Sequence, residues 1–131
     1  MTPEQFFKSV IGKAWENGAI GPEAYDCWGL VRSYYKQVRG IELPVVDVDA
    51  AQSMAVRHAF AGHPELSSWQ VVDSPAEGDA VLMGPNNRPN HVGLWVNGGV
   101  LHSVKGGGVI YTNPMMLRKS GWNILGNYRH Q

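Results

Sequence analysis

Apolar residues follow a helical spacing in the first third of the chain. They recur over residues 6–11, and again from Asp26, a favourable N-cap, to Val38, after which Gly40 can end a helix. Residues 50–61 show a weaker amphipathic pattern. This part of the sequence therefore predicts two N-terminal helices and a short third one.

The second half of the chain changes to short apolar runs with a spacing of two residues, separated by glycine and proline. These runs predict strands at residues 71–72, 80–83, 91–96, 100–104, 109–112 and 124–129. Helices followed by antiparallel strands are typical of an α+β domain. We therefore expect a single domain over residues 1–131, with the helices packed on a central antiparallel sheet of about five to six strands.

Composition and charge exclude several classes of protein. The chain carries 11 basic and 11 acidic residues, and 44% of its residues are hydrophobic. Because nucleic-acid binding requires a basic excess, no nucleic-acid partner is expected. No apolar run approaches the ~20 residues of a membrane span, so no membrane insertion is expected either. The N-terminus does not resemble a signal peptide, which predicts synthesis in the cytoplasm. One cysteine excludes an internal disulfide and a cysteine-based zinc cluster.

Cys27 is the single thiol, and it follows Asp26 at the predicted start of the second helix. Unpaired backbone N–H groups and the positive end of the helix dipole favour a thiolate at that position. We therefore expect a lowered pKa for Cys27 and a role as a nucleophile. The structural alternative is a small buried residue, because Cys27 also shares the apolar face of the helix with Leu30 and Val31.

Two histidines, His91 and His102, lie in neighbouring predicted strands. A two-residue hairpin loop at residues 97–98 or 98–99 pairs residues whose numbers sum to 195 or 197, and both registers place the histidines on one sheet face. The sum of 195 also sets Gly93 opposite His102, which leaves room for the two rings. A three-residue loop without a bulge would separate them. A converging pair of histidines can act as a base and its orienting partner.

Two other uses of these side chains stay open. One histidine could be buried and the other exposed, each with a structural role. Alternatively, Cys27, His91 and His102 could hold a zinc ion together with a water molecule, although the chain has no H-E-x-x-H pair.

Four segments carry a family resemblance when they are taken together. They are Tyr25-Asp26-Cys27-Trp28-Gly29-Leu30-Val31, Gly78-Asp79-Ala80-Val81, His91-Val92-Gly93-Leu94-Trp95 and Leu101-His102-Ser103. In this order they resemble the NlpC family of papain-like cell-wall cysteine peptidases. The matches run from about residue 12 to residue 103, which is most of the chain.

The resemblance implies a papain-like NlpC fold with Cys27 as nucleophile, His91 as general base and His102 as the residue that orients His91. It implies that Asp26 helps to bind the free amine of the substrate. The implied reaction is hydrolysis of peptidoglycan stem peptides, at the bond between D-γ-glutamyl and meso-diaminopimelate or a lysine equivalent. No metal or organic cofactor is expected.

Two tryptophans depart from the pattern of the family beside the substrate site. Trp28 stands where the family has a serine, which places a bulky side chain next to the cysteine. Trp15 stands about where a tyrosine of the family assists the oxyanion hole, and its indole N–H can donate one hydrogen bond. We therefore count Trp15 and Trp28, with Asp26, as candidate substrate-binding residues.

The sequence of residues 25–32, in a short chain that we expect to lack a leader, resembles the variant found in tail-assembly or tail-tip proteins of tailed phages and prophages. This implies incorporation near the tail tip, other tail proteins as candidate partners, and action on the periplasmic cell wall. Two alternatives stay open: a structural tail component with the same fold and little catalysis, and a thiol amidase or acyltransferase. Trp69 and Trp122 could anchor an interface or lie in the core.

Overall fold

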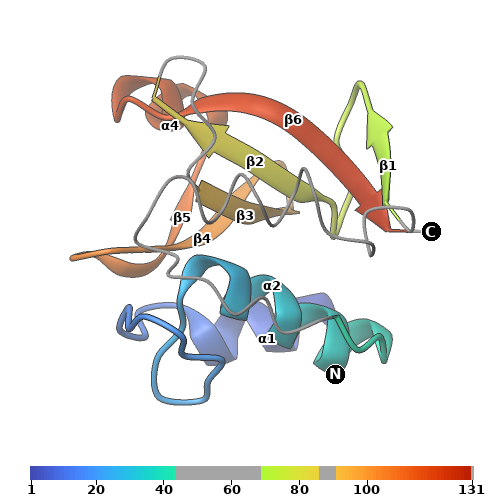
Figure 1. Ribbon diagram of the computed structural model, residues 1–131, viewed down its shortest axis with the longest axis vertical. Coiled ribbons are helices and arrows are strands. Elements are labelled where there is room, and N and C mark those ends of the chain that lie inside the picture. The colour runs from blue at the N-terminus through green and yellow to red at the C-terminus, as the bar shows by residue number, and fades with distance from the viewer. Residues whose placement is uncertain (44–68, 86–90, 131) are drawn as a thin grey trace.

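An antiparallel sheet forms one layer of the molecule, and the N-terminal helices lie along one of its faces (Figure 1). The computed structural model describes residues 1–43, 69–85 and 91–130. Within these ranges the sheet has six strands in the order β1-β6-β2-β3-β4-β5. Their bounds are β1 Trp69–Val72, β2 Ala80–Gly84, β3 His91–Val96, β4 Gly99–Val104, β5 Gly108–Thr112 and β6 Asn123–His130. The predicted α+β class and central sheet are confirmed.

The helices begin with favourable caps. Thr2 and Gln5 form a reciprocal capping box at the start of the first helix, and Asp26 caps the second. The second helix continues into a π-helical segment and ends at Gly40, which has a left-handed φ of 68°. The predicted third helix at residues 50–61 lies outside the described residues. The helices are α1 Pro3–Val10, α2 Cys27–Tyr34, the π-helical η1 Tyr35–Arg39 and α4 Pro114–Lys119.

The main core lies between the sheet and the helices α1, α2 and η1. Side chains from alternate positions of β3 and β4 meet apolar residues of these helices, as the period of two predicts. The members of this cluster that are fully buried are Phe6, Val10, Leu30, Val31, Tyr35, Ala80, Val92, Leu94 and Leu101. A smaller cluster under α4, on the opposite sheet face, contains Val81, Met83, Val100 and Leu117.

The β3–β4 hairpin has the two-residue loop that the sequence predicts. Asn97 and Gly98 have φ values of 48° and 79°, as a type I′ turn requires. Leu94 pairs with Leu101 and Val96 with Gly99, so the numbers of paired residues sum to 195. This register confirms the expectation that His91 and His102 share one face of the sheet.

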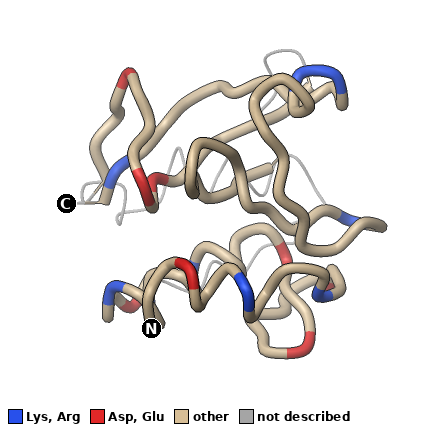
Figure 2. Tube along the Cα trace, turned by 180° about the vertical axis from the view of Figure 1, so that it is seen from behind, with Lys and Arg blue, Asp and Glu red and all other residues tan. Residues whose placement is uncertain are grey.

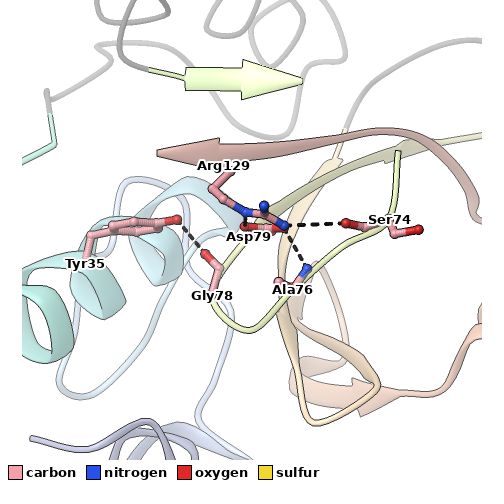
Figure 3. Close-up of polar contacts among 6 residues, drawn as sticks. All are labelled: Tyr35, Ser74, Ala76, Gly78, Asp79 and Arg129. Carbon is pink, nitrogen blue, oxygen red and sulfur yellow. Dashed lines mark hydrogen bonds and ion pairs between the residues drawn. The ribbon is translucent and has the colours of Figure 1, made fainter. Parts of the chain in front are cut away.

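A buried carboxylate and the glycine before it together join the sheet to the helical layer at one end (Figure 3). Asp79 is 2% exposed, and it accepts hydrogen bonds from Nε and Nη2 of Arg129 at 3.0 and 2.9 Å and from the Ala76 N–H at 2.7 Å. The hydroxyl of Tyr35 donates to the carbonyl of neighbouring Gly78. The glycine–aspartate pair therefore ties η1, the entry to β2 and the C-terminal strand together.

Charged residues are interspersed over both layers rather than gathered by sign (Figure 2). The formal net charge is +0, consistent with this mixture. Among the helices of the described ranges, none is both long and apolar enough to cross a membrane.

Candidate active site

The first turn of α2 carries Cys27 and is held by the side chain of Asp26. The Asp26 carboxylate accepts the N–H of Gly29, as the predicted N-cap should, and also the N–H of Gly18 at 2.8 Å. Asp26 is 6% exposed, and burial raises the pKa of its carboxyl, although these two hydrogen bonds act in the opposite direction. One carboxylate thus caps the helix and fixes the loop that precedes it.

Two further contacts position the same turn. A Cβ on Gly29 would lie 2.0 Å from the carbonyl oxygen of Ala19, so only glycine allows this close approach of the loop. The hydroxyl of Ser103, a buried residue of β4, donates to the carbonyl of Tyr25. The backbone just before Cys27 is therefore fixed directly to the strand that carries His102.

Cys27 is buried at the start of α2 against β3. It is 2% exposed, and the backbone N–H of Val92, the residue after His91, hydrogen-bonds its sulfur. Burial raises the pKa of the Cys27 thiol to about 12, and the nearby Asp26 charge adds to the rise. The expected lowering of this pKa is therefore wrong. The helix-start N–H groups do act in the predicted direction, but desolvation outweighs them.

The two predicted histidines meet in a direct hydrogen bond. Nε2 of His91 lies 2.8 Å from Nδ1 of His102, and the two residues are 5% and 0% exposed. A Cβ on Gly93 would lie 3.0 Å from Cβ of His102 and 2.7 Å from Cγ1 of Val100. The absence of a side chain at Gly93 therefore makes room for the pair, as predicted, and the alternative of one exposed histidine is wrong.

Both imidazoles are neutral at physiological pH. Burial lowers the pKa of His91 to about 3, with repulsion from His102 as a further cause, and burial lowers the pKa of His102 to about 4. A neutral imidazole has one donor and one acceptor nitrogen, so the ring contact is an ordinary N–H···N bond. In the described ranges, no group of three His, Cys, Asp or Glu side chains is placed to hold a metal ion, so the zinc arrangement is not formed.

The structure adds two neighbours that the sequence did not indicate. Nε2 of His102 lies 3.0 Å from Oγ1 of Thr112 on β5. The indole of Trp122, between α4 and β6, stacks on the His91 ring with centroids 4.7 Å apart and an interplanar angle of 31°. Trp122 thus packs against the candidate site, and Trp69 is buried in the main core.

The candidate substrate-binding residues lie at the start of α2 and in a segment that contacts the residues before it. Trp28 is half-buried in the first turn and packs against the main core. Trp15 is half-buried beneath the ammonium of Lys105, which lies 5.8 Å from its ring centroid. The Tyr25 N–H donates to the carbonyl of Ala14, which brings the segment of Trp15 alongside the approach to Cys27. The binding roles of these residues, and the pairing of the Cys27 thiol with His91, stay predictions.

The sequence pattern of a known family covers this whole arrangement. The model of the NlpC/P60 family matches residues 12–123, a range that includes Cys27, His91 and His102. The chain belongs to the NlpC/P60 family. This confirms the resemblance that the motifs indicated, and the match extends beyond residue 103 into β6.

Two relatives show where such NlpC/P60 sequences occur. The chain is 28% identical over 113 residues to "Probable endopeptidase p60" of Listeria monocytogenes, covering 86% of this chain and 20% of that protein. It is 32% identical over 84 residues to "Tail tip assembly protein K" of Escherichia phage N15, covering 59% of this chain and 33% of that protein. The chain therefore spans a fifth to a third of the length of these relatives.

Solved structures of the same family have the same fold. The chain superposes on NlpC1 from Trichomonas vaginalis with a TM-score of 0.66 and 22% identity, covering 96% of this chain and 42% of that one. It superposes on the NlpC/p60 domain of the peptidoglycan hydrolase SagA with a TM-score of 0.61 and 18% identity, covering 98% and 93% of the two chains. The predicted NlpC fold is confirmed.

Proposed function

We propose that this NlpC/P60 domain is a cysteine endopeptidase that hydrolyses peptidoglycan stem peptides. The observation that carries the proposal is the buried hydrogen bond between His91 and His102, at the start of the strand whose backbone contacts the sulfur of Cys27. A purely structural role does not require this combination of a thiol and two converging imidazoles. In the proposed reaction Cys27 is the nucleophile, His91 the general base and His102 the residue that orients His91.

The chemistry begins from a neutral thiol and a neutral imidazole. As the sulfur of Cys27 attacks the amide carbonyl, its proton passes to Nδ1 of His91, because Nε2 faces His102. The His91 imidazolium then protonates the departing amine, which leaves a thioester on Cys27. Water adds to the thioester while His91 accepts a proton, and the free acid and the thiol are released.

Negative charge develops on the carbonyl oxygen of the substrate when the sulfur attacks. Hydrogen-bond donors are needed to stabilise this charge, and the start of α2 can supply them. The N–H groups in the first turn of a helix point away from the intrahelical ladder. The Cys27 N–H is therefore a suitable oxyanion donor, and the indole N–H of Trp15 is a second candidate. Asp26 is the candidate for binding the substrate amine, with Trp28 forming part of the adjacent surface.

The bond proposed for cleavage is the one between D-γ-glutamyl and meso-diaminopimelate, or its lysine equivalent. Membership of the NlpC/P60 family and the similarity to a probable endopeptidase of Listeria support this choice. The similarity to a phage tail tip assembly protein supports synthesis in a host cytoplasm, docking to other tail proteins and action on the periplasmic wall.

Mass spectrometry of purified muropeptides tests the proposal. The wild type and Cys27→Ala are incubated with the same muropeptides, and unfolding curves verify that both proteins are folded. The expected result is a product cut after γ-D-glutamate with the wild type alone. Cleavage of another amide would favour an amidase or acyltransferase, and no product from either folded protein would favour a structural tail component.

A further inference from the structure

The hydrogen-bonded chain at the candidate site does not stop at His102. That residue is fully buried on β4, and its two ring nitrogens face two different partners. Nδ1 lies 2.8 Å from Nε2 of His91, and Nε2 lies 3.0 Å from Oγ1 of Thr112 on the neighbouring strand. Thr112 pairs with Val100 in the sheet, which places it diagonally across from His102 on the same face.

The protonated form of His91 determines which nitrogen donates and which accepts in each of these two hydrogen bonds. An imidazolium carries a proton on both nitrogens, so Nε2 of His91 must then donate to Nδ1 of His102. Neutral His102 must therefore carry its own proton on Nε2, which points at Thr112. A buried N–H group without an acceptor is costly, and the hydroxyl oxygen of Thr112 is placed to accept it.

We propose that Thr112 is a positioning residue that holds the proton of His102 on Nε2, so that His102 can accept from His91 and leave Nδ1 of His91 free to take up a proton. If Nδ1 of His102 instead donated to Nε2 of His91, the proton of neutral His91 would lie on Nδ1, and that nitrogen could not act as the base. Thr112 is half-buried, so its own hydroxyl proton can point to solvent while its oxygen accepts.

Two variants separate the hydroxyl group from the shape of the side chain. Thr112→Val keeps the branched shape that suits a strand but removes the acceptor, and Thr112→Ser keeps the hydroxyl. Ile110→Val is a matched control. Ile110 lies on β5, as Thr112 does, and pairs with His102 of β4, but its side chain offers no hydrogen-bonding group.

Nitrogen-15 spectra of labelled histidines read the tautomers directly in a Cys27→Ala background. The wild-type sequence, Thr112→Ser and Ile110→Val should all show the proton on Nε2 of both His91 and His102. Thr112→Val should move the proton of His102 to Nδ1. A proton on Nδ1 of His102 with Thr112 present, or an unchanged pattern in Thr112→Val, would overturn the proposal.

The catalytic consequence rests on the proposed function and is measured separately. With intact Cys27, Thr112→Val should lower kcat on stem peptides by about tenfold or more with little change in KM, and Thr112→Ser should restore most of the rate. Equal rates for the valine variant and the wild type would contradict this role. If the wild type cleaves no stem peptide, the peptidase proposal fails, whereas the spectra still decide the role of Thr112.

Discussion

Cys27 should titrate as a buried neutral thiol in the substrate-free protein. Its pKa is raised to about 12 and that of His91 is lowered to about 3, so the two values lie roughly nine apart. At about 1.36 kcal/mol per pKa unit, moving the proton from sulfur to nitrogen costs on the order of 10 kcal/mol. Even for two ions only about 4 Å apart, their attraction would return no more than about 4 kcal/mol at an effective dielectric constant of about 20, so the neutral pair is favoured.

The rate of alkylation by iodoacetamide tests this state, because only the thiolate reacts. The chain has one cysteine, so Cys27 is the single thiol that iodoacetamide can label, and the mass of the intact protein measures that labelling after subtraction of the background. The rate should rise about tenfold per pH unit from pH 5 to pH 10 without a plateau. At pH 7 the thiolate fraction should be on the order of a thousandfold below that of a free cysteine, whose pKa is ~8.5.

Two controls isolate the ionisation from other effects. Cys27→Ala gives the background of labelling at other groups, and unfolding in urea should restore a midpoint near the value of a free thiol. A midpoint below ~8.5 in the folded protein, or a rate plateau near neutral pH, would contradict a buried neutral thiol at Cys27. Such a result would mean that the N–H groups at the start of α2 outweigh desolvation.

Three further outcomes follow from the site. His91→Ala should abolish turnover with the fold intact, and His102→Ala should reduce the rate less; steady-state kinetics with both variants checks this order, and a reversed order would exchange the two roles. The free energy of unfolding should fall as pH drops from about 6.5 towards 4, because His91 and His102 bind protons in the unfolded state at a higher pH than in the folded state. It should also fall as pH rises above about 8.5, because the Cys27 thiol ionises there in the unfolded state but not in the folded state. Urea unfolding at a series of pH values measures this, and a flat profile would contradict the burial of these groups. Gly93→Ala should lower stability by roughly 1–3 kcal/mol and displace His102, because the added Cβ would lie 2.7 Å from Cγ1 of Val100 and 3.0 Å from Cβ of His102. An unchanged melting temperature together with unchanged histidine spectra would contradict the tight packing.

The sequence predicted those parts of the fold that depend on local patterns. The N-cap at Asp26 and the Asn97–Gly98 turn each follow from residue types within a few positions, and the structure confirms both. The turn sets the register of β3 and β4, and this register places His91 next to His102. The six-residue helix α4 is not among the helices that the apolar pattern predicts, although Asn113 and Pro114 are a typical N-cap and N1 pair.

The other features required the three-dimensional structure. The glycine run at the start of β5 allows several loop lengths, so the sequence does not define how β5 pairs with β4. The contact of Thr112 with His102 therefore could not be predicted from residue numbers. Trp122 reaches His91 from a loop that no pairing rule places. The raised pKa of Cys27 does not follow from the sequence, because the sequence shows the helix start but not the depth of burial.

In the proposed reaction, Cys27 forms a covalent bond with the acyl part of the substrate. Rapid quenching of the wild type with a synthetic stem peptide, followed by intact-protein and peptide mass spectrometry, measures this bond. We expect an added mass equal to that of the γ-glutamyl fragment, located on Cys27 and absent from Cys27→Ala. Product formation with Cys27 unmodified, or cleavage retained in Cys27→Ala, would contradict it.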